Sequence, residues 1–356
     1  MVGANFSFSM RWTPMSPKGL TAFKFWGIIS AFLLLFFSVL ILCPLVGPER
    51  MSLARALDTS LARDKNPDAA ILFHVRLPRC LMAAIVGAAL AAAGVTFQSM
   101  LKNPLATPYT LGISGGSSLA AVIILVYAGS LSLKIPFLQP LAAFGGAVLT
   151  LWLVYKLGRR QGILQNVTLI LAGVTLNLFF SAMILLIQFL VDPTQTVLIM
   201  HWLMGSLDID RYEPILMIIP FQIAGIAVLL YHARDMNLLS LDEMSAQSLG
   251  LRVPVVMKRL YISSSLIAGT AIAFSGPIGF VGLIIPHALR MLLGADHRLL
   301  LPASYLAGGA FLVICDTAAR TLLAPTELPV GVITALLGGP FFLAILIRPK
   351  SGGGIV

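Results

Sequence analysis

The chain has 356 residues, of which 58% are hydrophobic and 11% are charged, and its mean hydropathy is +0.95. Soluble domains carry about 25% charged residues, so this composition excludes a soluble globular protein. The formal net charge of +10 comes from basic residues that stand singly between apolar runs. That pattern argues against a nucleic-acid partner and favours contact with anionic membrane lipid.

Long apolar stretches bounded by charged residues, proline or glycine predict an all-α polytopic membrane protein with about ten transmembrane helices. We expect a tail over residues 1–22, a single transmembrane domain over 23–348 and a second tail over 349–356. The predicted helices lie near residues 23–43, 77–98, 110–128, 136–157, 167–190, 213–232, 256–275, 278–293, 300–318 and 329–348.

Ten spans place both termini on one side of the membrane. If that side is the cytoplasm, the inner segments hold 15 Lys and Arg residues and the outer segments hold 9, in agreement with the positive-inside rule. We therefore expect both termini in the cytoplasm. Six of the nine outer charges lie in residues 44–79, where Leu53, Leu57 and Leu61 are spaced four apart and predict a short helix on the surface.

Residues 112–118 read GISGGSS and contain the G-x-S-G pattern of intramembrane serine proteases. His287 lies in another predicted span, so a serine and histidine pair is formally available. The pattern is short and common, however, and Ser114 follows Pro108 at the expected start of a helix. Serine is a favoured cap there and small residues permit close helix packing, so we favour a packing role for this stretch.

The sequence lacks the residues that nucleotide or metal binding requires. No G-x-x-x-x-G-K-[ST] loop occurs, so any ATP and its Mg²⁺ must be bound by another protein. The five histidines and three cysteines show no metal-ligand spacing. We expect no catalytic residue, no metal and no cofactor in this chain, and no enzyme activity of its own.

All fourteen acidic residues fall in loops or near the ends of predicted helices. Proton- or sodium-coupled carriers place an ionisable group inside the bilayer, and cation channels use acidic rings or carbonyl filters. The sequence therefore argues against a secondary transporter or a channel that works alone, which stays as the alternative function.

Two arginines stand out on the expected outer face. Arg76 and Arg79 flank the start of helix 77–98, where Pro78 suits the first turn but the helix dipole disfavours positive charge. Positive charge is thus disfavoured here for two reasons, the helix dipole and the position on the outer face. This suggests a binding partner for both arginines. The other interpretation is that the side chains extend to lipid phosphates.

The inner segment 233–259 is long and polar. It predicts two short helices, interrupted at Gly250 and Pro254, with Asp242 and Glu243 in a first turn, where the dipole favours acids. A short helix that projects from a membrane domain can dock a soluble protein. An amphipathic loop that rests on lipid is the alternative.

Four blocks of the sequence resemble the FecCD-like permease subunits of type II ABC importers for iron-siderophore, haem and vitamin B12 uptake. They follow one another at natural spacing and cover residues 76–116, 238–251, 276–302 and 316–342. The resemblance implies a transmembrane permease domain over 23–348 with coupling helices within 233–259. It also implies a second permease copy, two cytoplasmic ATPase subunits and a periplasmic or lipid-anchored binding protein, all at the bacterial cytoplasmic membrane.

The resemblance also implies roles for particular residues. The outer arginines that receive acidic residues of the binding protein match Arg76, Arg79 and Arg320, although an i, i+4 pair with Asp316 is another interpretation of Arg320. The fifth predicted helix, near residues 167–190, has no charged residue and would line most of a path for a bulky chelate. The expected ATPase contacts are Asp242, Glu243, Ser245, Ala246, Gln247, Leu249 and Gly250, and the expected gate and path residues are Asn103, Pro104, Leu105, Asn166, Val167, Gly173, Thr175, Asn177 and Ser181.

Overall fold

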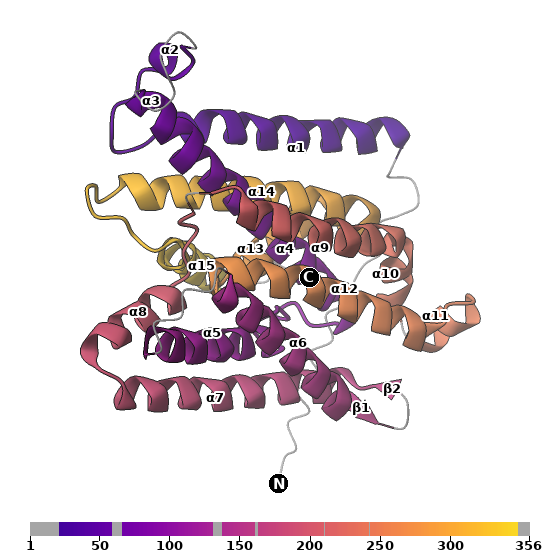
Figure 1. The fold of residues 1–356 in the computed structure, drawn as a ribbon. Coiled ribbons are helices and arrows are strands. Elements are labelled where there is room, and N and C mark those ends of the chain that lie inside the picture. The colour runs from indigo at the N-terminus through magenta and orange to yellow at the C-terminus, as the bar shows by residue number, and fades with distance from the viewer. Residues whose placement is uncertain are drawn as a thin grey trace.

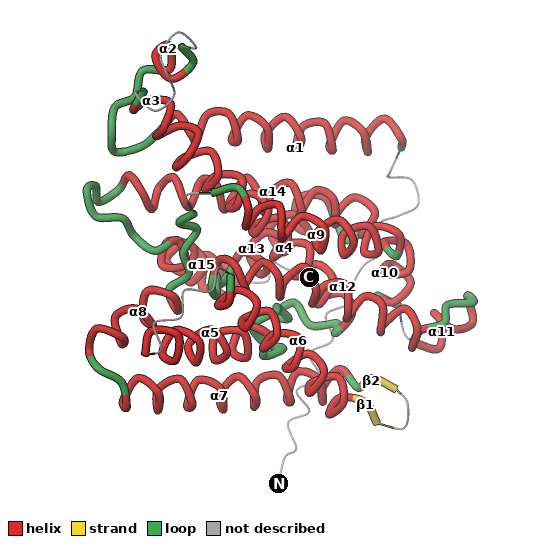
Figure 2. Tube along the Cα trace, viewed as in Figure 1, coloured by secondary structure: helices red, strands yellow, loops and turns green. Residues whose placement is uncertain are grey.

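The computed structural model describes residues 21–58, 66–130, 137–160, 163–209, 211–241 and 243–347. This part of the chain is almost wholly helical, as Figure 2 shows. The predicted tails lie almost entirely outside the described residues. Ten helices correspond to the ten predicted spans: α1 (Ala22–Leu42), α4 (Leu77–Met100), α5 (Ile113–Ser130), α6 (Leu138–Gly158), α7 (Asn166–Leu190), α9 (Glu213–Tyr231), α12 (Val253–Ser275), α13 (Val281–Leu293), α14 (His297–Thr321) and α15 (Val330–Ile347).

Length and composition support the predicted number of spans. Within the described residues, seven helices are long and apolar enough to cross a membrane, and three further apolar helices, in α5, α13 and α15, are shorter. Seven and three make the predicted ten. The described residues also contain short elements: η1 (Cys43–Leu45), α2 (Leu53–Ala56), α3 (Pro67–Ala70), η3 (Ile71–Arg76), α8 (Pro193–Leu203), α10 (Ala233–Leu239), α11 (Glu243–Ser248), β1 (Arg159–Arg160) and β2 (Ile163–Leu164).

The second predicted span begins earlier than its apolar pattern indicates. α3, η3 and α4 form one continuous run from Pro67 to Met100, capped by Asn66, whose side chain accepts the N–H of Ala69. Pro78 lies in the first turn of α4, as predicted, but inside this continuous helical run. Proline in a helix removes one backbone hydrogen bond and crowds the carbonyl four residues earlier. The π-helical turn of η3, directly before it, is the kind of local widening that accommodates such a disruption.

The core of the bundle consists of α4 with α12 and α14 packed against it. In the run that contains α4, 89% of the most apolar stretch is buried inside the bundle. In α7 the corresponding share is 17%. α4 reaches its neighbours through glycine. A Cβ at Gly94 would overlap the carbonyl oxygen of Gly282 on α13, and one at Gly87 would overlap that of Gly308 on α14. Small residues thus let these backbones touch, as in other membrane bundles.

The short elements gather at the two ends of the bundle (Figure 1). α2, α3 and α8 lie at one end, which we call the α3 end, whereas α10, α11 and the β1–β2 hairpin lie at the other, the α11 end. α2 covers the first turn of the predicted surface helix, while Leu61 lies outside the described residues. α8 was not predicted, because its 11 residues are too short for a span.

Candidate functional site

A buried ionic cluster occupies the α3 end. The two carboxylate oxygens of Asp316 each accept one arginine: Arg79 Nε at 2.9 Å and Arg320 Nε at 3.2 Å. Arg79 also donates through Nη1 to Glu327 Oε2 at 2.6 Å and lies 3.8 Å from Asp208 Oδ1. The Asp316 side chain is 0% exposed and the two arginines are 6% and 3% exposed. The cluster thus joins α4, α14 and the turn before α15.

Arg76 has a different set of partners. Its guanidinium donates to three backbone carbonyls after α1: Pro44 at 3.2 Å, Leu45 at 3.4 Å and Glu49 at 2.7 Å. A buried arginine must satisfy its N–H groups within the protein. This one does so by fixing the segment that leaves α1 against the η3–α4 helix.

The three predicted docking arginines are therefore all buried and engaged within the chain. The pair between Arg320 and Asp316, which the spacing indicated, is present. The side chains exposed at the cluster are acidic, with Asp208 76% and Glu327 48% exposed. Sequence reasoning missed both as partners of Arg79, because they lie far from it along the chain and in loops without a motif. The docking role of the arginines stays a prediction.

At the opposite end, α10 and α11 form the predicted pair of short helices, here called the α10–α11 segment (residues 233–251). Gly250 ends α11 in a left-handed conformation with φ +87. Its N–H donates to Gln247 O at 2.9 Å, and the N–H of Leu251 donates to Ala246 O at 3.1 Å. This is a Schellman cap, which glycine adopts without strain. Pro254 lies in the first turn of α12 and does not separate two short helices.

One face of α11 is exposed. Met244 is 83% and Leu249 63% exposed, and Gln247 and Ser248 are exposed beside them. Ala246 is fully buried and, two residues from Met244 along the helix, lies on the opposite side from it. Six residues define a helix face poorly in sequence, so neither the exposure of Met244 nor the burial of Ala246 could be predicted. The ATPase contacts, Ala246 among them, stay a prediction.

The remaining expected contacts flank that face. Ser245 is partly buried, Gly250 is exposed and Glu243 begins α11, whereas Asp242 lies outside the described residues. Leu249 and Gln247 are thus the expected contacts whose side chains are both described and exposed.

The turn after α4 touches the α10–α11 segment. Lys102 Nζ donates to the carbonyl oxygen of Leu241 at 2.5 Å. Directly after it, Asn103 Oδ1 accepts the N–H of Leu105 at 2.9 Å in an Asx turn, and Leu105 is 51% exposed. The predicted gate at residues 103–105 is thus linked to the segment that precedes α11, a contact that no sequence motif signals.

Asn237 fastens α10 to the turn before α14. Its Nδ2 donates to Asp296 Oδ1 at 2.8 Å and its Oδ1 accepts the N–H of His297 at 2.8 Å. Burial by itself would raise the pKa of Asp296, but hydrogen bonds from Arg298 and Asn237 outweigh it and lower the pKa to about 2. The carboxylate's stabilising contribution is therefore complete above its ordinary pKa of 3.8 and is lost only as the pH falls through about 2.

We expect Asn237→Ala to lower the free energy of unfolding by about 1–3 kcal/mol, because it removes the partner of the His297 N–H and one of the hydrogen bonds to the Asp296 carboxylate, which keeps Arg298. Amide hydrogen exchange should rise in α10 and stay unchanged in α4. Ser248→Ala, which removes hydrogen bonds made only within α11, is the control. Equal exchange in α10 of wild type and Asn237→Ala would show that this junction does not hold the segment.

A pocket of about 230 Å³ lies between α5, α7, α8 and the turn before α13; its lining is partly apolar, and we call it the polar pocket after its serine and asparagine side chains. Asn177 and Ser181, two of the predicted path residues, line it together with Ser114 and Ser118 from the GISGGSS stretch. The side chains that line it are uncharged. The pocket can therefore offer hydrogen bonds to a polar molecule without holding an ion by charge.

The other predicted path and gate residues lie along α7, apart from Pro104 in the turn after α4. Gly173 is buried, and a Cβ there would lie 2.5 Å from Thr110 O, so the glycine allows close packing, while its role in the path stays a prediction. Thr175 is exposed on the same helix. Asn166 begins α7, and Val167 beside it is 79% exposed. Pro104, in the turn after α4, is partly buried.

The glycines of the GISGGSS stretch serve close packing. A Cβ at Gly115 would overlap Asn177 Oδ1, and one at Gly116 would overlap the side chain of Thr150. The pocket that contains Ser114 is not lined by His287, whose ring lies 5.8 Å from that of Phe342. Within the described residues, no group of three or more His, Cys, Asp and Glu side chains could hold a metal ion.

A polytopic helical bundle with an uncharged polar pocket among its helices and an exposed short helix at one end has the architecture of a membrane transport permease. The comparisons with known proteins agree. The chain belongs to the FecCD transport family, whose model matches residues 32–348.

Three relatives illustrate the similarity. The chain is 42% identical over 278 residues to the cobalamin import system permease protein BtuC of Halobacterium salinarum, covering 78% of this chain and 73% of that protein. It is 40% identical over 286 residues to the hemin transport system permease protein HmuU of Yersinia pestis, covering 79% and 84%. A solved inward-facing structure described as a metal-chelate type ABC transporter superposes with a TM-score of 0.76 at 32% identity and covers 91% of this chain and 100% of that one. The fold is that of an ABC importer permease.

Proposed function

We propose that two copies of this chain form the translocation path of an ABC importer in the bacterial cytoplasmic membrane. Two cytoplasmic ATPase subunits bind the α11 end, and a periplasmic or lipid-anchored substrate-binding protein docks at the α3 end. The observation that carries this proposal is the pair of exposed apolar side chains Met244 and Leu249, on and directly after a helix whose cap and neighbours hold it in a defined position. The names of the relatives support the same assignment.

The charges support this orientation. Lys102, Lys156, Arg234 and Arg252 all belong to segments at the α11 end, which accordingly faces the cytoplasm under the positive-inside rule. Both termini lie on that side if the chain crosses ten times. The ATP and its Mg²⁺ bind to the partner subunits, so this chain takes no part in the hydrolysis.

Coupling runs from α11 to the path. Closure of the ATPase dimer displaces α11, and α10 follows because the two helices are adjacent in a single short segment. Lys102 carries the displacement to the gate turn 103–105, since it is hydrogen-bonded to Leu241. Asn166 and Val167 at the start of α7 form the second gating position. Beyond them, α7 leads to the pocket of Asn177 and Ser181.

The cargo class is a bulky metal chelate, such as a ferric siderophore or haem, or cobalamin. An uncharged, hydrogen-bonding path suits a large molecule that must not be held tightly during transit, and the binding protein then supplies most of the selectivity. The relatives named for cobalamin and hemin support this class.

The test is reconstitution. The purified chain, co-expressed with candidate ATPase subunits, should form a complex with two ATPases and two permeases, and liposomes containing it should take up a chelate only with ATP and binding protein. Uptake driven by a proton or sodium gradient in liposomes that contain the chain alone would overturn the proposal and favour the secondary transporter. Asp316, the buried acid near the end of α14, is paired with two arginines and so is not poised to carry a coupling ion.

A further inference from the structure

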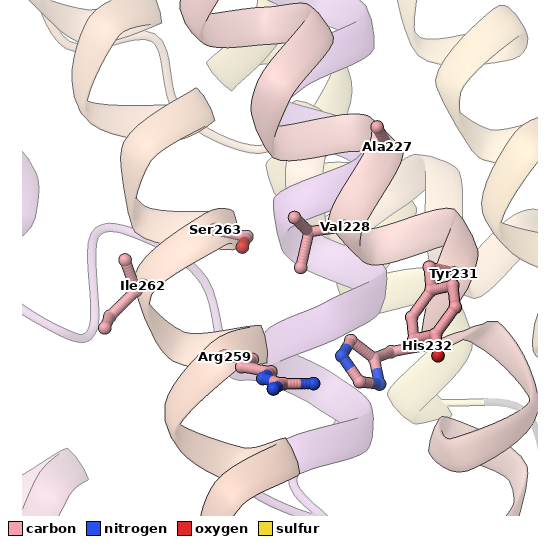
Figure 3. A pocket seen from close by; sticks show the side chains of 7 residues that line it. All are labelled: Ala227, Val228, Tyr231, His232, Arg259, Ile262 and Ser263. Carbon is pink, nitrogen blue, oxygen red and sulfur yellow. The ribbon is translucent and has the colours of Figure 1, made fainter.

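A groove of about 450 Å³ lies between α9 and α12 near the α11 end. Its walls are apolar and include Ala227 and Val228 in the last two turns of α9 and Ile262 on α12 (Figure 3). Both helices are long and apolar enough to cross a membrane, so we expect these walls to face hydrocarbon. Acyl chains are the natural occupants of such walls.

The groove has a basic end. Arg259 on α12 points toward the ring of His232, which begins the turn after α9 (Figure 3). Arg259 is exposed and makes no hydrogen bond or ion pair with the described residues. Asp235, in the first turn of α10, is already hydrogen-bonded to His232 Nδ1 at 2.6 Å. A positive charge at the mouth of the groove thus lacks a counter-charge within the described chain.

The position of this charge matches the headgroup level of a membrane. Tyr231 is the last residue of α9 and is 78% exposed, as tyrosines at membrane interfaces are. The polar α10–α11 segment follows immediately. Basic pockets between transmembrane helices at the cytoplasmic boundary bind anionic headgroups.

The geometry points to a binding site for one anionic phospholipid, with its phosphate against Arg259 and an acyl chain along Ala227, Val228 and Ile262. The site does not overlap the polar pocket or the exposed face of α11. Its occupancy is independent of the proposed transport function and can be measured on the chain alone.

Native mass spectrometry of the full chain in detergent, titrated with phosphatidylglycerol or phosphatidylcholine, tests the site. Wild type should retain one phosphatidylglycerol in preference to phosphatidylcholine. Arg259→Gln should weaken this retention about fivefold, the effect of one basic residue at a membrane surface. Lys258→Gln is the matched control, since Lys258 is the exposed neighbour that does not line the groove. Ala227→Phe, which fills the groove without changing charge, should reduce retention of both lipids.

Three results would overturn the site. Equal losses in Arg259→Gln and Lys258→Gln would mean that lipid is attracted by the general surface charge. Displacement of the lipid by glycerol 3-phosphate at equal concentration would mean that a free phosphate, and not a lipid, is bound. A change of oligomeric mass in Ala227→Phe would mean that a second copy of the chain covers the groove.

Discussion

Asp316→Ala is expected to destabilise the protein by about 3–5 kcal/mol, the cost of removing one partner from a buried ion pair. Asp316 accepts both Arg79 and Arg320, so its loss leaves two buried guanidinium groups without their shared carboxylate. Glu327 compensates Arg79 only in part because its side chain is 48% exposed and is screened by solvent. Thermal and denaturant unfolding in detergent measure the effect.

Two comparisons separate the buried pair from surface charge. Asp208→Ala removes an acid that is 76% exposed and 3.8 Å from Arg79, so its effect should stay within about 0.5 kcal/mol. Adding Arg320→Met to Asp316→Ala should recover part of the loss, because one uncompensated charge disappears. If Asp316→Ala were no more destabilising than Asp208→Ala, the cluster would not be a structural element of the α3 end.

Arg76 and Arg79 also show which contacts can be predicted from the sequence and which cannot. Positive charge at the start of a helix is unfavourable, and from this the need for a partner of Arg76 and Arg79 was predicted. The helix continues back to Pro67, so that reason does not hold, and the arginines need partners because they are buried. The structure supplies partners inside the chain. Arg79 binds Asp316, 237 residues further on, and Arg76 binds backbone carbonyls. Neither contact has a local signal, because both depend on how distant helices pack.

The spans were predictable for a simpler reason. A helix that crosses a bilayer needs about 20 apolar residues, and that signal is long and continuous. Its edges are less certain where the chain stays helical beyond the apolar run, as in the extension from Leu77 back to Pro67. The face of a six-residue helix such as α11 has no comparable signal, so Met244 and Ala246 could be assigned to opposite faces only in three dimensions.

Met244→Glu combined with Leu249→Glu is expected to abolish assembly with the ATPase, weakening the complex roughly a hundredfold or more, since central apolar anchors each contribute about 2 kcal/mol or more to an interface. Both side chains are exposed, so the unfolding temperature of the isolated chain should stay unchanged.

The control for that pair of substitutions is Leu53→Glu with Leu57→Glu on and beside α2. These leucines are 44% and 58% exposed and lie at the opposite end of the bundle, so the same charge is added without touching α11. Co-purification and ATP-driven uptake should both be lost in the α11 variant and kept in the α2 variant. If the α11 variant kept its ATPase but lost uptake, α11 would transmit the closure without providing the binding energy. If it kept both, the docking surface would have to lie elsewhere at the α11 end, and Met244 and Leu249 would no longer carry the proposal.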